Sequence, residues 1–428
     1  MGGGAGKHRE ARYKVKTIKV KEAFLVQLPK GQQPVLPVPV DLPSTGKVTV
    51  LTADVGGTSS RLHIWQAPAE SDNHLSPSEL VSSERIIHER KYRNAGFDSF
   101  CDIVKTFLSD VGMTEPPLLA CLGVAGVVVD NSVKFVNLGW TVDGADLGRR
   151  LGIPRVVLIN DFEAQGYGVL TIDPRKDCDI LQDAEPLAGA PMALVGAGTG
   201  LGEAFLTMSP NGDYDVWPSE GGHAEFAPRQ DGSSNLQFEM LQYLQIKYSA
   251  RSRVSIERIV SGKGIANIYE FLAWRFPERK NPAVHNLFAH GNPSEGRSQF
   301  DPALVVENAK NESCELCQQA IEMFVGAYGS EAGVVALKYM PFGGLFLTGG
   351  VTAKTKEYLL GTRGQPGHFL EAFHDKGRVR GMLNRMPIWV VQGEDMGERG
   401  VRLKACRIVE EMRLMRQPSK GHMNSENA

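Results

Sequence analysis

The stretch LTADVGGTSSRL, residues 51–62, places a carboxylate, a glycine pair and several hydroxyls directly after an apolar run. Asp54 lies at the end of that run, and Gly56, Gly57 and Thr58 follow it. A carboxylate at the end of a strand can hold Mg²⁺ through water, and glycines let backbone N–H groups approach phosphate oxygens. A Gly-Gly pair is also a good two-residue turn. By itself, the stretch is compatible with both a hairpin and a phosphate site.

A second glycine-rich stretch, VGAGTGLG at residues 195–202, lies between two further predicted strands. It is not a dinucleotide-binding fingerprint, because no glycine falls at the sixth place counted from Gly196 or Gly198. It is not a Walker A loop, because no Gly-Lys-Ser/Thr follows. A glycine-rich turn between strands suits a phosphate cradle, and a flexible hairpin is the alternative.

The order of predicted elements indicates an α/β fold, because strands alternate with helices. The predicted strands cover 47–53, 61–66, 118–125, 133–136, 155–159, 192–195, 203–208, 345–348 and 388–391. The predicted helices cover 97–108, 236–248, 257–274, 304–337 and a closing helix over 401–415, and 285–302 is predicted to be a surface loop. The strand–turn–strand unit near residue 50 recurs near residue 192, which suggests a duplicated fold with a cleft between its halves.

Composition favours a reduced, soluble, cytoplasmic protein. The chain has 428 residues, a formal net charge of −2 and six scattered cysteines, so neither nucleic acid nor an acidic membrane is an expected partner. The longest apolar run, 118–129, is too short to span a bilayer, and the N-terminus lacks the apolar core of a signal peptide. Cys314 and Cys317 form a lone CxxC, which is expected to be a pair of helix cysteines rather than a zinc site.

The two ends of the chain differ from its body. Residues 1–47 carry nine Lys and Arg residues against three acids and close with a proline-spaced stretch, which is typical of a basic extension and linker. Residues 417–428 are expected to be a disordered tail.

The stretch VLINDFEAQGYG places Asn160 and Asp161 at the end of a buried strand. Ligands of open α/β sheets bind at that edge, and a carboxylate there, partnered by an amide, could accept a proton from a hydroxyl. The alternative is that these residues only cap the following helix, since Asn and Asp are both good N-caps.

Three further stretches carry polar or glycine-rich features. Glu220 and His223 flank a glycine pair in PSEGGHAEFAPR, where they could bind a polyol or serve as ordinary hydrogen-bonded residues. Glu257 in SIERIVSGKG could be a helix-face carboxylate with no special role. In FLTGGV, Gly349 and Gly350 could let a flat adenine lie on the backbone.

Together these motifs resemble one family, the bacterial-type glucokinases of the hexokinase/actin-like ATPase superfamily. DVGGT, INDF, GAGTGLG, EGGH followed by FAP, ERxxSGxG and FGGxFxxGG occur in the family's order over about residues 48–416. The resemblance implies a two-domain actin-like ATPase (ribonuclease H-like) α/β fold with a cleft between the domains. The implied small domain comprises 48–170 and a C-terminal helix at 394–416, and the implied large domain comprises 171–393.

The same resemblance implies a reaction, its substrates and its cofactors. The family transfers the γ-phosphoryl group of ATP to the 6-hydroxyl of glucose with Mg²⁺, and its members are often homodimers. The implied general base is Asp161, for which an ordinary low pKa suffices. The implied sugar ligands are Asn160, Glu220, His223 and Glu257. The implied nucleotide ligands are Asp54, Gly56, Gly57, Thr58, Gly198, Thr199, Gly200, Gly349 and Gly350, with Asp54 holding Mg²⁺ through water.

Two alternative functions stay open at this point. One is an actin-like or sugar-sensing binding protein that keeps the fold without catalysis, since fold alone does not determine function. The other is a kinase for a different small hydroxylated or carboxylic substrate. The chain also departs from the family in its basic N-terminal arm and in Ser60, which replaces the usual Ala; neither departure is expected to touch the implied roles.

Overall fold

A computed structural model describes residues 47–68, 76–82, 85–135, 138–230, 234–249, 253–364 and 367–414, all of which belong to one compact unit. The predicted basic extension, apart from Lys47, and the predicted tail lie outside the described residues.

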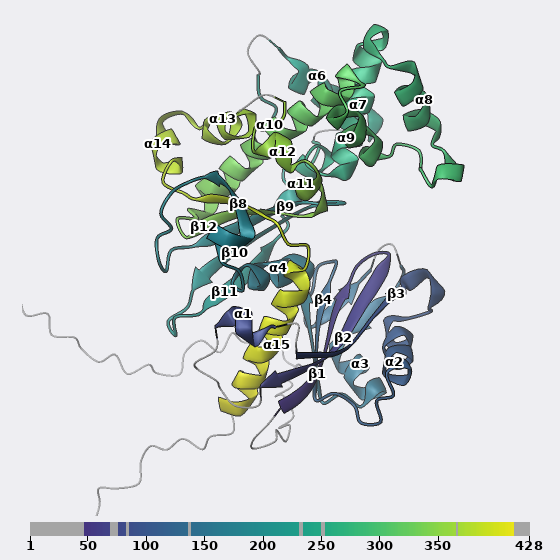
Figure 1. The fold of residues 1–428 in the computed structure, drawn as a ribbon, viewed down its shortest axis with the longest axis vertical. Helices are drawn as coiled ribbons and strands as arrows, with labels where there is room; N and C mark the ends of the chain where they lie inside the picture. Colours follow the sequence, from purple (N-terminus) through teal and green to yellow (C-terminus); the bar gives the residue numbers. More distant parts are fainter. Residues whose placement is uncertain are drawn as a thin grey trace, which may run out of the picture. The chain divides into compact units, whose positions relative to one another are not determined.

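The first of two large sheets has five strands in the order β3-β2-β1-β4-β7 (Figure 1). The strands are β1 (Lys47–Val55), β2 (Ser59–Pro68), β3 (Ile86–Arg93), β4 (Leu119–Val124) and β7 (Arg155–Asn160). β1 and β3 both pair antiparallel with β2, whereas β4 is parallel to both β1 and β7. The carboxyl ends of β1, β4 and β7 therefore meet at one edge of the sheet.

The second sheet repeats this order with six strands, β11-β10-β9-β12-β13-β8. The strands are β8 (Cys178–Gln182), β9 (Met192–Ala197), β10 (Leu201–Met208), β11 (Tyr214–Ser219), β12 (Gly344–Thr348) and β13 (Ile388–Val391). β9 is antiparallel to β10 and parallel to β12, as β1 is to β2 and β4. The predicted repeat of a strand–turn–strand unit is therefore present in both sheets.

The helices complete the described fold. They are α1 (Pro77–Leu80), α2 (Phe100–Asp110), α3 (Gly144–Leu151), α4 (Asp161–Val169), α5 (Pro174–Asp177), α6 (Leu236–Lys247), α7 (Gly262–Arg275), α8 (Pro282–His290), α9 (Pro302–Lys310), α10 (Glu315–Tyr339), α11 (Gly350–Lys354), α12 (Lys356–Leu359), α13 (His368–His374), α14 (Arg380–Leu383) and α15 (Met396–Leu414). Short 3₁₀ turns lie at η2 (Asn94–Gly96), η3 (Gly221–His223), η4 (Ile256–Arg258), η5 (Pro277–Arg279), η6 (Pro293–Glu295) and η7 (Gly377–Val379), and a small sheet pairs β5 (Ser132–Lys134) with β6 (Thr141–Asp143).

Alternation along the strands divides the first sheet between two cores. On β1, Leu51, Ala53 and Val55 pack with α2 and α3, whereas Val48 and Val50 face a core formed with α4 and α15. This is the period-two pattern of a strand that is covered on both faces. The second core also includes residues of β9, β10 and β12, so α4 and α15 join the two sheets.

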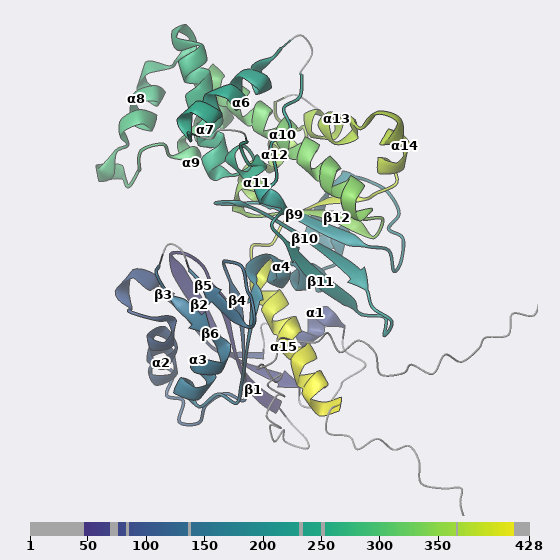
Figure 2. The ribbon, with the colours of Figure 1, turned by 180° about the vertical axis from the view of Figure 1, so that it is seen from behind.

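α4 and α15 lie side by side, as Figures 1 and 2 both show. Close packing depends on glycine, because a Cβ on Gly168 would overlap the backbone of Met396 and one on Gly400 would overlap the backbone of Ala164. This contact fixes the direction of α4 and, with it, the position of Asp161 at its first turn.

α10 is the central helix of the remaining core, where it packs with α7, α9 and α13 (Figure 2). By length and composition it could cross a membrane, but 78% of its most apolar window is buried inside the protein. Cys314 caps its N-terminus by accepting a hydrogen bond from the backbone N–H of Cys317, and both thiols are buried. The prediction of helix cysteines is confirmed.

The structure corrects three predicted elements. The single helix predicted over 304–337 is two helices, α9 and α10, because Glu312 has a φ of 56° and Cys314 starts a new helix. The loop predicted over 285–302 is wrong in its first part, where α8 extends to His290. The helix predicted over 257–274 is broken into η4 and α7, and Ser261 caps the second piece.

Candidate active site

The first glycine turn joins β1 to β2 and is a hairpin. Gly56 N–H donates to the carbonyl of Ser59 at 3.0 Å, and Asp54 lies opposite Arg61 on β2 and Gly123 on β4. The hairpin alternative is thus confirmed, without excluding a ligand. The backbone N–H groups of Gly57 and Thr58 donate to no acceptor among the described residues.

Asn94 holds this turn from behind. It is fully buried in η2, and its Nδ2 donates to the carbonyl of Gly56 at 2.8 Å. Its backbone N–H donates to the carbonyl of Thr58 at 2.9 Å, and its Oδ1 accepts from the hydroxyl of Ser60 at 2.8 Å. Asn94 is a site residue that sequence reasoning missed, because the strand that precedes it was not predicted.

The second glycine turn is also a hairpin, between β9 and β10. Gly198 N–H donates to the carbonyl of Gly200 at 2.8 Å, while the Gly198 carbonyl accepts from Gly262 N–H at 2.9 Å. The N–H groups of Thr199 and Gly200 have no acceptor among the described residues. Each of the two turns therefore presents two adjacent backbone donors, which is the arrangement that suits an anion.

The Gly349-Gly350 pair starts α11 beside the second turn. Gly349 has a φ of 98°, and a Cβ there would overlap the backbone of Ala197. Gly350 is exposed, with nothing within 4 Å of a Cβ built on it. The pair therefore lies next to the end of β9, at the same edge of the second sheet as the glycine turn.

Phe162 ties α4 to the second hairpin. A Cβ on Gly196 or Gly202 would overlap its ring, so these glycines are required by the close approach of the aromatic side chain. Thr348 of β12 also donates to Gln165 of α4 at 2.8 Å. These contacts place the start of α4 against the second hairpin.

Asn160 is the N-cap of α4. Its Oδ1 accepts from the N–H groups of Phe162 at 2.8 Å and Glu163 at 3.2 Å, and its Nδ2 donates to the carbonyl of Gly126 at 3.0 Å. The capping alternative is confirmed for this residue. One N–H of its amide group remains for a ligand, because the amide has two.

Asp161 is half-buried at the first turn of α4. Burial, together with the charges of Asp54 and Glu220, raises the pKa of its carboxyl to about 6, although the hydrogen bond from the Phe162 N–H acts in the opposite direction. The pKa of Asp161 is therefore above the ordinary low value that would suffice for the implied role. Two carboxylates from distant parts of the chain lie within electrostatic range of it.

Asp54 opens into a polar cavity of about 330 Å³. Its lining residues are Asp54, Ser59, Arg61, Lys91, Glu394, Asp395 and Glu398. Although Asp54 is exposed to this cavity, desolvation by the surrounding protein raises the pKa of its carboxyl, and the cations Arg61 and Lys91 act in the opposite direction. Arg61 itself is anchored by an ion pair of 2.6 Å with Glu398 of α15.

Glu220 and His223 lie on an open loop. Their side chains are 3.6 Å apart and are 58% and 60% exposed. The loop is fixed by its backbone, since Ile256 N–H donates to the carbonyl of Ala224 at 2.9 Å. This bond brings the EGGH motif next to the segment that carries Glu257.

Glu257 contacts the second hairpin. Its Oε2 accepts from the N–H of Leu201 at 3.0 Å, and a Cβ on Gly200 would overlap the carboxylate. The residue implied as a sugar ligand therefore also supports the turn implied for phosphate. The sequence did not indicate this contact, because 56 residues separate the two partners.

Within the described residues, no group of three or more His, Cys, Asp or Glu side chains is arranged to hold a metal ion. Any divalent cation at Asp54 would therefore have few direct protein ligands, as Mg²⁺ commonly does when it is bound with phosphate groups.

Comparison with solved structures defines the class of protein. A glucokinase from an Antarctic psychrotroph superposes with a TM-score of 0.63 at 26% identity, over 83% of this chain and 98% of the other. A glucokinase from Balamuthia mandrillaris, in complex with glucose, gives a TM-score of 0.64 at 20% identity, over 86% of this chain and 95% of the other, which shows the fold alone. The chain has the α/β fold of the actin-like sugar kinases.

Sequence comparison then identifies the family. The glucokinase family model matches residues 51–407. A glucokinase from Nostoc sp. is 36% identical over 84% of this chain and 99% of its own length, and one from Synechocystis sp. is 36% identical over 84% and 98%. This chain belongs to the glucokinase family, which confirms the family that the order of motifs predicted.

Proposed function

We propose that the protein catalyses ATP-dependent phosphorylation of glucose at its 6-hydroxyl. The observation that carries the proposal is the position of Asp161 at the first turn of α4, which packs against the second glycine hairpin through Phe162, within electrostatic range of both Asp54 and Glu220. It connects a candidate base with the first glycine turn on one side and the EGGH loop on the other. Membership of the glucokinase family supports the same reaction. A related glucokinase from Streptomyces griseus has been crystallised with glucose and AMPPNP.

Asp161 is the proposed general base. In the transition state for phosphoryl transfer, positioning and neutralisation of charge matter more than covalent chemistry. The carboxylate would accept the proton of the sugar hydroxyl as the new O–P bond forms. A pKa near 6 keeps the group ionised at neutral pH and close to the range in which general bases work best.

The sugar would be bound by Asn160, Glu220, His223 and Glu257. Their amide, carboxylate and imidazole groups can match hydroxyls that both donate and accept hydrogen bonds. An epimer would leave one of these groups unpaired, which is how such sites discriminate. The second oxygen of Glu257 is available for this role while Oε2 supports the hairpin.

The nucleotide would lie along the two glycine turns. Gly57, Thr58, Thr199 and Gly200 supply backbone donors for phosphate oxygens, and the Gly349-Gly350 pair supplies a flat surface for adenosine. The carboxylate of Asp54, open to a polar cavity, suits Mg²⁺ held through water. Mg²⁺ bound with ATP would neutralise phosphate charge. Asp54 would orient this complex. Its own negative charge would stay close to the carboxyl of Asp161.

The domain division is part of the proposal. Residues 48–170 with the helix at 394–416 would form a small domain, residues 171–393 a large one, and the active site would lie in the cleft between them. The repeated strand order of the two sheets supports this division. Closure over glucose would exclude water and limit hydrolysis of ATP. A homodimer and a cytoplasmic location stay predictions from the resemblance.

A coupled assay with glucose and Mg-ATP tests the proposal. The purified chain should form glucose 6-phosphate, with no product when ATP or glucose is omitted. A panel of sugars and phosphoryl donors in the same assay separates glucose from mannose and glucosamine, and ATP from ADP or polyphosphate. Sugar binding without turnover for any donor would instead support a sensor.

A further inference from the structure

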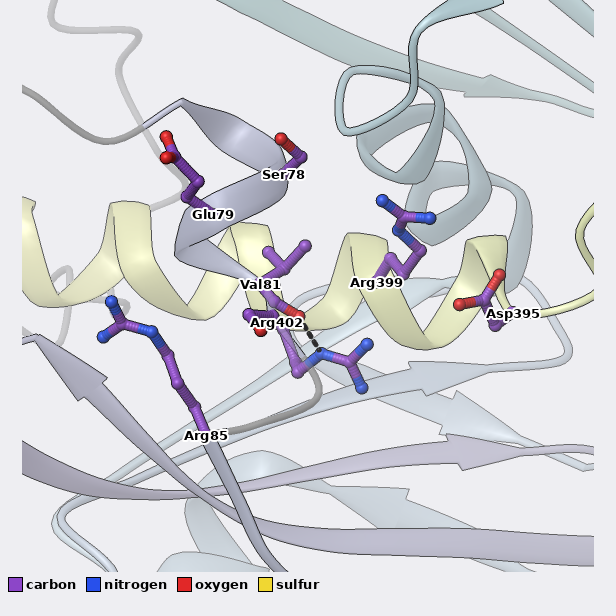
Figure 3. A pocket seen from close by; sticks show the side chains of 8 residues that line it. Ser78, Glu79, Val81, Arg85, Asp395, Arg399 and Arg402 are labelled. Atoms are coloured by element: carbon purple, nitrogen blue, oxygen red, sulfur yellow. Dashed lines mark hydrogen bonds between the residues drawn. The ribbon is translucent and has the colours of Figure 1, made fainter. Parts of the chain in front are cut away.

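A polar cavity of about 540 Å³ lies between α15 and the segment that carries α1 (Figure 3). Its arginines do not converge, since Arg85 points away from Arg399 and Arg402. Arg402 donates from Nε to the carbonyl of Val81 at 3.2 Å, and Arg399 donates from Nη2 to the carbonyl of Thr171 at 2.8 Å. These side chains therefore join α15 to its neighbours and form no common binding point.

A pair of buried carboxyls in the core of the second sheet has no part in the proposed mechanism. Glu203 is on β10 and Glu331 is on α10, and they are 1% and 7% exposed. Strand alternation puts Glu203 on the same face of β10 as Leu201 and Phe205, which pack in the core formed with α10. α10 lies along this face of the second sheet, as Figure 2 shows. Glu203 therefore faces the helix from the sheet.

The two carboxyls meet without a donor from the rest of the protein. They lie in hydrogen-bond contact with each other. No N–H or O–H group of the described residues donates to either oxygen of Glu203 or to Oε1 of Glu331. An ionised carboxylate can only accept hydrogen bonds, so a proton on one of the two supplies the donor for their contact. The pair is therefore one carboxyl and one carboxylate that share a proton.

The charged and titratable groups around the pair do not replace this proton. Lys338 on α10 is exposed, and Lys376 donates from Nζ to a backbone carbonyl of α13 at 3.1 Å. Tyr328, on α10, donates its phenol proton to a backbone carbonyl of β9 at 2.9 Å. Neither lysine donates to the three buried carboxyl oxygens. Burial, followed by the charge of Glu331, raises the pKa of Glu203 to about 8, against the effect of Lys338.

The EGGH loop, Glu220–His223, rests directly on Glu203. A Cβ on Gly221 would overlap the carboxylate of Glu203, and a Cβ on Gly222 would overlap the backbone of β10. The last residue of β11 lies opposite Glu203 in the sheet and leads into the loop. A displacement of the Glu203 side chain would therefore be passed to the loop and to its two proposed sugar ligands.

We propose that Glu203 is a positioning residue for the sugar, which holds the EGGH loop in its binding position only while it shares a proton with Glu331. Loss of the proton leaves two like charges in contact in the core, and their repulsion displaces the side chain that lies against Gly221. Since the pKa of Glu203 is raised to about 8, the affinity for glucose falls as the pH rises through that value. The inference rests on the proposed function for the identity of the sugar.

Calorimetric titration of glucose at pH 7 and pH 9 tests the effect on the sugar. The dissociation constant of the unmodified chain should rise by about three- to tenfold between these values, the effect of one weakened hydrogen bond. Glu203→Gln should remove this rise, because an amide N–H can donate to Glu331 at either pH. A Glu203→Gln variant that loses as much affinity as the unmodified chain would contradict the proposal.

Glu322→Gln is the matched control for this titration. Glu322 is also on α10, and burial also raises the pKa of its carboxyl, but it lies beside Gly364 and not beside the EGGH loop. The variant should therefore keep the rise in the dissociation constant between pH 7 and pH 9. Loss of the rise in this variant would contradict a role that is specific to Glu203.

Hydrogen–deuterium exchange gives a readout that needs no ligand. At pH 9 the amides of residues 217–226 should exchange more slowly in Glu203→Gln than in the unmodified chain, with no difference at pH 7. Comparison of the two chains at one pH cancels the intrinsic dependence of exchange on pH. Equal exchange at pH 9 would contradict the proposal, and so would a slowing that α2, in the core of the other sheet, shares equally.

The two measurements separate this inference from the proposed reaction. A chain that binds glucose in this pH-dependent way but forms no product would support the positioning role and contradict the kinase. A chain that forms glucose 6-phosphate but binds glucose equally at pH 7 and pH 9 would do the reverse. If tetramethylammonium in place of Na⁺ and K⁺ weakens glucose binding by the unmodified chain and not by Glu203→Gln, the pair holds a metal cation, which would contradict the shared proton.

Discussion

The hydroxyl of Ser60 donates a 2.8 Å hydrogen bond to Oδ1 of buried Asn94, whose amide and backbone N–H hold the first glycine turn. Ser60 stands where the family usually has Ala, and no motif in the sequence connects it with the site. The structure corrects this, because Ser60 orients the amide that binds the Gly56 carbonyl. The pair therefore acts on the nucleotide end of the proposed site through the backbone.

Asn94→Ala should raise the KM for Mg-ATP more than the KM for glucose. The variant removes the side-chain hydrogen bonds that hold the first glycine turn. It should also lower the free energy of unfolding by about 1–3 kcal/mol, the usual effect of a lost buried hydrogen-bond partner. Steady-state kinetics with each substrate varied in turn measures the difference.

Asn131→Ala is the matched control for this experiment. Asn131 also joins backbone segments, by donating to the carbonyl of Val156 and accepting from Leu158 N–H, both at 2.8 Å. It should lose stability without a selective change in the KM for Mg-ATP. Equal changes in both KM values for Asn94→Ala would show that the hydrogen bonds of Asn94 do not selectively affect the binding of Mg-ATP.

Glu257→Gln should raise the KM for both substrates, because Glu257 supports Leu201 of the second hairpin and is also a proposed sugar ligand. Glu220→Gln, on the open loop, should change the KM for glucose alone. Steady-state kinetics of both variants, with each substrate varied in turn, separates support of the second hairpin from binding of the sugar. An unchanged KM for Mg-ATP in Glu257→Gln would show that its contact with the hairpin does not affect the nucleotide.

A buried pair of carboxyls lies behind the EGGH loop. Glu203 and Glu331 are 1% and 7% exposed, and a Cβ on Gly221 would overlap the carboxylate of Glu203. Burial, followed by the charge of Glu331, raises the pKa of Glu203 to about 8. Burial also raises the pKa of Glu331. The folded protein therefore holds a proton there at pH values where the unfolded chain has lost it.

The free energy of unfolding should fall as the pH rises from about 4.5 towards 8, because the native state binds more protons than the unfolded state in that window. Glu203→Gln should remove much of this dependence and stabilise the protein at pH 8 by about 1–3 kcal/mol, with little effect at pH 5. Urea unfolding at both pH values measures it. Glu239→Gln, a surface residue, is the control; a Glu203→Gln variant that loses stability equally at both values would contradict the account.

The dependence of kcat/KM on pH should show an acidic limb near pH 6, because Asp161 must be ionised to accept a proton. Asp54→Asn removes a like charge, so the limb should move to lower pH. The same variant should weaken use of Mg-ATP more than binding of glucose. The control is Asp146→Asn, an exposed acid on α3, which should leave the limb in place. A limb unmoved by Asp54→Asn would mean that the two carboxylates do not interact.

Much of the fold was predictable because its signals are local. Apolar runs that end in polar or glycine residues predicted β1, β4, β7, β9 and β12. β3 and β11 were missed, because β3 has no buried residue and β11 only one, so neither strand has a clear apolar pattern. The break before α10 was missed although residues 310–313 are all polar, because it depends on the backbone conformation of Glu312 and on the local cap at Cys314.

The site was predictable as a set of motifs but not as a set of contacts. The ordered motifs indicated the family, and each of them ends at a strand edge or a turn. Contacts such as Phe162 with Gly202, or Glu257 with Leu201, join segments that are distant in the sequence. The raised pKa of Asp161 could not be predicted either, since it depends on burial and on charges from two other parts of the chain.

The central claim is that Asp161 is the general base, and the Asp161→Asn variant tests it most directly. Its kcat should fall by about 10²–10⁴-fold, the usual contribution of a positioned base, while glucose binds with nearly unchanged affinity. Single-turnover kinetics together with calorimetric titration of glucose measures both quantities on the same preparation. Near-normal turnover by Asp161→Asn, in a variant that binds glucose normally, would contradict the assignment.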